Sequence, residues 1–440
     1  MAMTDSYDLT LSTGSDEAAS HYRRGVEHML AAWTGAAEAL DEALLADPDF
    51  ALARAARARL YAMRAQISKA RTEIEAAQEV VARRGTQRER SHVGVLALAL
   101  SGQSAKALDA ALAHADLWPH DTVILSLPLG AFGLFAFSGM AHHDQARVDL
   151  CEHHAPSFAE DDWWFLTNRG WSLAENGQVA RGRNMLERAL ELRRESANGV
   201  HALVHAMFES GAGDTAEALI KEWLPGYDRS GILHGHIAWH AALVALERGD
   251  TPAALAAYEG AVHPSVSLGM PINVVTDTAS FLWRMQAYGH DVSAQSWQEI
   301  ADYARSAFPR AGHNFVDPHM AMIEAATGDR QGLARRVEAL EDLVANDALS
   351  AGQVVPTIAR AAQAFTDGDY AACIQILEPQ AAEVVRIGGS GAQREIVEDT
   401  LLVALMRDGQ ADKARALLDR RLHRRPSPRD VKWRASLEAS

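Results

Sequence analysis

DGDYAACI, which runs from Asp367 to Ile374, is the stretch that decides the fold. Glycine just past a helix end can adopt the left-handed conformation that closes the helix. The polar residue after it suits the N-cap of a second helix. The small alanines that follow let this second helix pack closely on the first. The stretch therefore predicts a tight turn inside a helical hairpin.

The same pattern occurs nine times, at intervals of about 36 to 41 residues, which is the spacing of helical-repeat arrays. The glycines that mark it are Gly102, Gly139, Gly177, Gly213, Gly249, Gly289, Gly328, Gly368 and Gly409. The repeats at Gly139 and Gly289 are irregular, with longer or less regular turns. DGDY followed by alanine resembles the turn between the two helices of a tetratricopeptide repeat.

This recurrence predicts an all-α fold of tetratricopeptide-like helical-hairpin repeats, stacked into a right-handed superhelix (an α-solenoid). We expect a single helical-repeat domain over residues 1–440, with about ten hairpins. A short polar segment at 1–16 should precede the array. The break at PSPRD predicts a C-terminal capping helix near 427–440.

Composition favours helices and excludes several classes of partner. Alanine and leucine dominate and aromatic residues make up only 7%, a profile that suits helices better than sheets. The formal net charge of -16 argues against nucleic acid or an anionic membrane as a partner, because either needs a basic face. Local basic runs such as that at Arg420–Arg425 are explained by a solvated helix face.

The sequence also indicates a cytoplasmic protein. Cys151 and Cys373 are too few for a disulfide framework, so a reducing compartment is expected. The first residues lack the basic start and apolar stretch of a signal peptide. The longest apolar stretch, Val123–Phe137, is shorter than the ~20 residues of a membrane span and contains Pro128. We expect it to form a buried repeat helix.

Several segments, taken in order, resemble the tetratricopeptide repeat protein 38 family over nearly the whole chain. They are Ala46-Asp47-Pro48, TQRERSHV with His92, GVHALVH, HGHIAWHAAL with Trp239, TDTASFLWR with Arg284, VDPHMAM, and GGSGAQRE from Gly388 to Glu395. The resemblance implies the repeat fold and brings no biochemical activity with it. On its strength His92, Trp239 and Arg284 are expected to be binding residues.

Polar residues recur at equivalent positions before successive turn glycines. His201 and His205 precede Gly213, and His236 and His240 precede Gly249, at nearly the same distances. Asp277 holds the corresponding place before Gly289, and Asp317 and His319 do so before Gly328. First helices line the concave surface of such arrays, so these groups should converge on one groove. The i, i+4 spacing puts each histidine pair on one helix face.

Two imidazoles one turn apart can chelate a divalent metal, and an added carboxylate suits zinc, iron, manganese or copper. His201, His205, His236 and His240 are thus candidate metal ligands. The metalloprotease signature HExxH is absent, so a base would come from Asp277, Asp317 or His319, the candidate catalytic residues. Neutral imidazoles beside aspartates can equally perform acid-base chemistry without metal. Histidines also often cap helices or hydrogen-bond a neighbouring helix.

Two further groups are candidate binding residues. Ser390, Gln393 and Arg394 lie in GGSGAQRE, whose glycines can form an anion nest. The same residues read as an S-x-x-Q capping box, so a plain helix start also explains them. Trp171 belongs to an aromatic patch that either packs in the core or lines an apolar ligand site.

Two functions fit these observations. In the first, the concave groove binds a peptide or small-molecule ligand through its histidines and aspartates. In the second, the same cluster holds one divalent metal in a small-molecule hydrolase or oxidase. Repeat arrays of this kind usually bind, which favours the first by analogy of fold alone. Neither the ligand nor the oligomeric state follows from the sequence.

Overall fold

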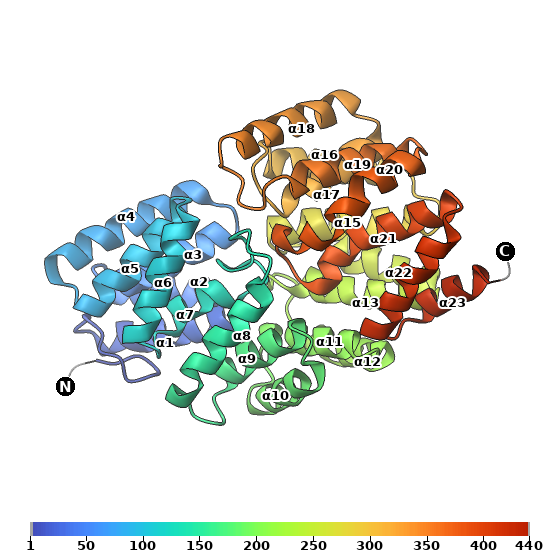
Figure 1. Cartoon of the computed structure of the whole chain (residues 1–440). Coiled ribbons are helices and arrows are strands. Elements are labelled where there is room, and N and C mark those ends of the chain that lie inside the picture. The colour runs from blue at the N-terminus through green and yellow to red at the C-terminus, as the bar shows by residue number, and fades with distance from the viewer. Residues whose placement is uncertain (1–2, 439–440) are drawn as a thin grey trace.

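The computed structural model describes residues 3–438, and all its regular elements in that range are helical (Figure 1). The N-terminal helices are α1 (Asp16–Ala31), α2 (Ala36–Ala46), α3 (Ala51–Met63), α4 (Ile67–Arg84), α5 (Gln87–Leu100), α6 (Ser104–Leu117) and α7 (Thr122–Leu129). The polar segment before α1 holds one isolated β-bridge, between Thr4 and Thr10. None of the helices in the described range is both long and apolar enough to cross a bilayer.

The remaining helices carry the candidate site. The central ones are α8 (His143–His154), α9 (Trp163–Glu175), α10 (Val179–Leu192), α11 (Ala197–Glu209), α12 (Gly213–Trp223), α13 (His234–Arg248), α14 (Thr251–Ala257), α15 (Pro271–Ala287) and α16 (Ala294–Ala307). The C-terminal ones are α17 (Val316–Thr327), α18 (Arg330–Ala345), α19 (Val354–Thr366), α20 (Tyr370–Leu377), α21 (Gly391–Arg407), α22 (Ala411–Arg424) and α23 (Pro428–Ser436). Short 3-10 or π-helical segments are η1 (Ala155–Ser157), η2 (Leu224–Gly226), η3 (Tyr258–Val262) and η4 (Glu378–Ile387).

Successive helices pair into stacked hairpins, so the predicted all-α, tetratricopeptide-like fold is confirmed. Gly249 closes α13 in the left-handed region at φ 84°, and the side chain of Asp250 then caps α14 by accepting the N–H of Ala253. One predicted turn position is wrong. Gly213 is the first residue of α12, and the left-handed residue is Gly211, because α11 already ends at Glu209.

The apolar stretch Val123–Phe137 forms a helix only in its first half, which corrects the prediction of a full repeat helix. The helix α7 ends at Leu129, and the chain then turns tightly, with the N–H of Gly133 donating to the carbonyl of Gly130. A Cβ on Gly133 would lie 2.7 Å from the carbonyl oxygen of Leu127, so only glycine fits this turn.

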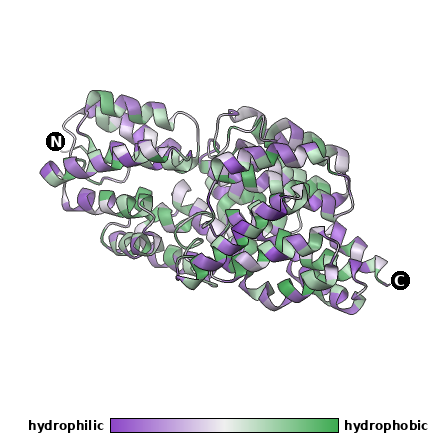
Figure 2. Ribbon diagram, turned by 90° about the horizontal axis from the view of Figure 1, so that it is seen from above, coloured by the Kyte–Doolittle hydropathy of each residue, from purple (hydrophilic) through white to green (hydrophobic). Residues whose placement is uncertain are grey.

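The first helices α11, α13, α15 and α17 are buried on nearly every side. Along α15 even the polar positions Asn273, Thr276 and Ser280 are buried, whereas α18, a second helix, buries only Leu333 and Leu340. A helix that is covered all round must have partners on both faces. The hydropathy colouring in Figure 2 shows apolar segments towards the interior of the C-terminal half and more polar segments on its outer helices.

The helix α21 supplies the second partner, because the superhelix curls far enough to place α21 against the earlier first helices (Figure 1). Its first N–H, from Gly391, donates to Glu175 at the end of α9 at 2.8 Å. Its Ala392 packs with Phe208 of α11 and Val244 of α13. The inner surface that should have formed an open groove is therefore covered here by the chain itself.

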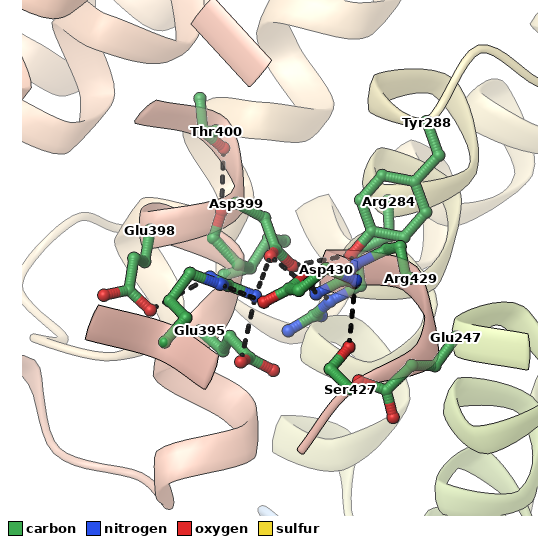
Figure 3. A network of polar contacts seen from close by, with 12 residues as sticks. Glu247, Arg284, Tyr288, Glu395, Glu398, Asp399, Thr400, Ser427, Arg429 and Asp430 are labelled. Carbon is green, nitrogen blue, oxygen red and sulfur yellow. Dashed lines mark hydrogen bonds and ion pairs between the residues drawn. The ribbon is translucent and has the colours of Figure 1, made fainter. Parts of the chain in front are cut away.

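Buried ion pairs hold α21 in this position (Figure 3). Arg421 of α22 pairs with Asp399 at 2.9 Å and with Asp430 of α23 at 2.6 Å. Arg284 of α15 pairs with the other oxygen of Asp399 at 3.1 Å and donates to the carbonyl of Ala392 at 2.9 Å. Buried charges of this kind are costly unless they are paired, so the network depends on every one of these contacts.

Candidate metal centre

Four histidines from two neighbouring first helices meet in the interior. They are His201 and His205 on α11 and His236 and His240 on α13, one helical turn apart in each pair. A potential ligand nitrogen from each lies within 4.8 Å of those of the other three. His205, His236 and His240 are buried, and His201 is partly exposed.

The imidazoles turn their Nε2 atoms towards one another. The Nε2 atom of His201 lies 3.0 Å from that of His205 and 3.0 Å from that of His236. In a tetrahedral zinc site with Zn–N distances of about 2.0–2.1 Å, ligand nitrogens are roughly 3.3 Å apart. The spacing of the three atoms is therefore close to that of ligands around one ion.

Two carboxylates orient the far nitrogens. The Nδ1 atom of His236 forms a hydrogen bond with Oδ2 of Asp277 at 2.8 Å, whereas the Nδ1 atom of His205 lies 3.2 Å from Oε1 of Glu175 without the alignment of a hydrogen bond. Histidines that bind metals usually donate their other N–H to a carboxylate or carbonyl, which fixes the tautomer and leaves Nε2 free to coordinate. The predicted residue Asp277 therefore lies beside the cluster and contacts an imidazole.

When both carboxylates are ionised and accept from Nδ1, neutral imidazoles leave one contact of this arrangement unsatisfied. Each has one N–H donor and one acceptor nitrogen. If His205 and His236 donate from Nδ1 to the ionised carboxylates, both of their Nε2 atoms are acceptors. The single Nε2–H of His201 can serve only one of them, and the other 3.0 Å contact sets two lone pairs against each other. A cation among these nitrogens removes the conflict.

His240 adds two more nitrogens, and neither has a hydrogen-bond partner among the described residues. Its ring lies edge-on to that of His205, with the centroids 4.3 Å apart. A buried polar atom without a partner is costly, and it is rare in native structures. Both nitrogens of His240 thus lack a partner, whereas the Nε2 atoms of the other three histidines contact one another, and a metal ion in the cluster would give a partner to one of the two.

Burial keeps these imidazoles in the form that binds metals. It lowers the pKa of His201 and of His240 well below the usual histidine value, and that of His205 also falls. Neighbouring imidazoles act in the same direction, because a second positive charge in a buried site is unfavourable. Neutral imidazole is the ligand form, so no proton has to be displaced at neutral pH.

Two tryptophans enclose the cluster. The ring of Trp171 stacks on His201, with centroids 5.6 Å apart, and meets His205 edge-on at 4.8 Å. The ring of Trp239 stacks on His236 at 5.4 Å. Both predicted binding residues therefore contact the imidazoles directly, where they shield the site from water and lower its dielectric constant.

Two of the predicted catalytic residues lie away from the cluster, which corrects the expectation of one shared groove. Asp317 accepts the N–H of Gly312 at 2.8 Å and pairs with Arg336. It lies in the first turn of α17, where the positive end of the helix dipole favours a carboxylate. His319 bonds through Nδ1 to the carbonyl of Phe315 at 2.8 Å.

The other candidate binding residues have structural partners. Ser390 and Gln393 form the capping box of α21, and Arg394 bonds to Asp144 at 3.0 Å and to a backbone carbonyl. Arg284 belongs to the ion-pair network of Figure 3. The glycines before α21 therefore belong to a plain helix start and not to an anion nest, because the first N–H of α21 donates to the chain's own carboxylate on Glu175.

His92 lies in a separate buried group on α5, α6 and the turn before α7. Its Nδ1 atom lies 2.9 Å from Oδ2 of Asp121, which also contacts His114 at 3.2 Å. Arg88 pairs with the same carboxylate at 2.7 Å. His92 lies 29 positions before Asp121 in the sequence. It takes no part in the four-histidine cluster.

Two acidic residues near the cluster were missed. Glu175 lies four residues after Trp171, and Glu209 four residues after His205, so each shares a helix face with a predicted residue. This spacing of four residues is the feature of the sequence that could have identified both glutamates. The two helices that carry them, α9 and α11, pack against each other, and the start of α21 lies beside both, since a Cβ on Gly391 would lie 3.5 Å from Glu209 and 3.8 Å from Glu175.

No protein-family model matches the sequence. Among solved structures, yeast Tom70 is similar over 95% of this chain and 87% of its own, with a TM-score of 0.36 and 13% identity. The TPR domain of P58(IPK) matches over 90% of both chains, with a TM-score of 0.23 and 13% identity. Naa15/Naa10 bound to HypK-THB matches over 92% of this chain and 63% of that chain, with a TM-score of 0.22 and 12% identity. At these scores no residue of the site has an assigned counterpart.

Proposed function

We propose that this chain is a metal-binding helical-repeat protein in which His201, His205, His236 and His240 hold one divalent transition-metal ion. The observation that carries the proposal is the pair of 3.0 Å contacts that Nε2 of His201 makes with Nε2 of His205 and of His236, whose Nδ1 atoms lie beside carboxylates. We further propose that the chain belongs with the tetratricopeptide repeat protein 38 family, as its shared segments indicate.

Zinc suits this donor set best, because four imidazole nitrogens complete a tetrahedral shell. The ion would then bridge α11 and α13 and, through Glu175, the start of α21. Metal binding would stabilise the closed superhelix by mass action, by about 2.7 kcal/mol when the free metal exceeds its dissociation constant a hundredfold. A peptide lying along the first helices is less favoured, since α21 covers that surface.

A second candidate function is a metal-dependent hydrolase or oxidase. It is favoured by a difference between His240 and the other three histidines, since the nitrogens of His240 form no hydrogen bond with the described residues. With three imidazole ligands the ion would keep one position for water or substrate. Cobalt substitution separates the two functions, because added azide shifts the cobalt spectrum only where a position is open.

Metal analysis of the full chain, purified without a histidine tag, tests the proposal. We expect about one equivalent of metal per chain, lost in His205→Ala and in His236→Ala. The matched control is His234→Ala on the same helix, whose side chain lies beside Tyr227, outside the cluster. Wild-type protein that stays free of metal after incubation with zinc, iron, manganese and copper would contradict the proposal.

A further inference from the structure

A cavity of about 570 Å³ opens beside Glu175, on the other side of this carboxylate from the histidines. The ends of α9 and α11, the segment η4 and the helices α20, α21 and α22 enclose it. Small-molecule sites usually have volumes of about 300–1,000 Å³. No residue of the four-histidine cluster lines this space, so it is a separate site.

The inner end of the cavity carries two carboxylates with different surroundings. Glu175 accepts the N–H of Gly391 through Oε2 and faces His205 through Oε1. Glu209 has neither a hydrogen bond nor an ion pair among the residues described. An oxygen of each carboxylate lies within 4 Å of the position that a Cβ on Gly391 would take, so both carboxylates border the same part of the cavity.

The other charged groups that line the cavity are already paired, apart from one arginine at its rim. Arg394 bonds to Asp144, Arg424 to Glu398, Lys413 to Glu378, and Glu395 to Arg421 and Arg425. Arg420 is exposed, and no partner is found for it in residues 3–438. Glu209 is therefore the carboxylate of the inner end that still lacks a counter-charge, and burial with the nearby Glu175 raises its pKa to about 7.

The walls between the inner end and the rim are mostly apolar. Leu377, Val385, Val397, Leu401 and Leu405 line them, together with several alanines. A ligand that fits must place an apolar body along these side chains. A buried end with positive charge and hydrogen-bond donors matches the inner end, because a cation there favours the ionised form of Glu209 and an ionised carboxylate only accepts.

We propose that this cavity binds an organic amine, with a primary ammonium group between Glu209 and Glu175 and an alkyl or aryl body along α20 and α21. The ammonium group offers three donors, and two carboxylates can accept them. An anion would meet the carboxylates at the inner end. A neutral alcohol would leave Glu209 without a counter-charge. The inference does not depend on a metal ion at the histidines.

Calorimetric titration of the full chain with hexylamine, hexan-1-ol and hexanoate tests the proposal. We expect saturable binding of hexylamine and binding of the other two that is at least about tenfold weaker. Glu209→Gln should weaken hexylamine binding about tenfold or more and leave hexan-1-ol unchanged. Glu378→Gln at the rim is the matched control, since its carboxylate pairs with Lys413, and it should bind hexylamine like the wild type.

A second variant tests the location without changing any charge. Ala382→Trp on η4 places a large ring in the wall and should abolish binding of hexylamine. Melting temperature and metal content of each variant show whether the fold and the metal centre are intact, which separates this inference from the proposed function. Hexylamine binding that survives both substitutions, or hexanoate binding more tightly than hexylamine, would overturn the assignment.

Discussion

Two buried groups of histidines in this chain differ in the charged side chains that contact them. In the N-terminal group, His92 and His114 contact the carboxylate of Asp121, and Arg88 pairs with it at 2.7 Å. The remaining nitrogen of His114 bonds to Ser91 at 2.9 Å. In the four-histidine cluster, no arginine or lysine of the described residues forms a hydrogen bond or ion pair with an imidazole.

The comparison shows why a set of potential ligands is not by itself a metal site. Burial raises the pKa of Asp121, but His92, His114 and Arg88 outweigh it and hold the pKa well below the usual value. The guanidinium group of Arg88 therefore occupies the electrostatic role that a metal ion would have. Among the described residues no cationic side chain bonds to the four histidines, and the Nε2 atoms of three of them face one another instead.

The largest effect is expected from removing the guanidinium group of the N-terminal cluster. Arg88→Met leaves Asp121 buried without its guanidinium partner, and loss of one partner of a buried pair costs about 3–5 kcal/mol. Urea denaturation followed by circular dichroism would measure the loss. Arg90→Met, on the exposed face of the same helix, is the control and should change stability by less than about 0.5 kcal/mol.

A small loss in Arg88→Met would mean that the arginine is not what satisfies this cluster, and the distinction between the two groups would fail. Zinc binding gained by the variant would sharpen it, since a metal would then replace the lost positive charge at His92 and His114.

The sequence predicts much of the fold because its signals are local. Gly249 and Asp250 end one helix and begin the next by contacts within a few residues. The i, i+4 spacing of His201 and His205 likewise places both on one face without reference to the rest of the chain. The convergence of this pair with His236 follows from the stacking of adjacent hairpins, which the period predicts.

What the sequence did not predict depends on contacts between distant segments. The docking of α21 on α9 joins Gly391 to Glu175 across 216 positions. A hint was present, since α21 has buried residues such as Val397, Leu402 and Leu405 on several faces, as expected of a helix with partners all round. His319 was misplaced because an equivalent repeat position fixes the depth of a residue but not which neighbour its side chain meets.

A smaller effect is expected at the carboxylate that orients His205. Glu175→Gln keeps the size of the side chain but weakens the hold on Nδ1 of His205, and loss of such a partner lowers metal affinity by about 10- to 100-fold. Competition with a chelating dye measures the change. Glu209→Gln, whose carboxylate contacts no imidazole, should bind metal with the affinity of the wild type, and equal losses in both variants would argue against this role.

Anomalous diffraction at the zinc absorption edge, from crystals of the zinc-loaded full chain, tests the central claim most directly. We expect one strong peak among His201, His205, His236 and His240, with nitrogen ligands at about 2.0–2.1 Å, and no peak beside Asp121. A peak at Asp121 and none among the four histidines, or no peak at either place with each imidazole hydrogen-bonded to water, would contradict it.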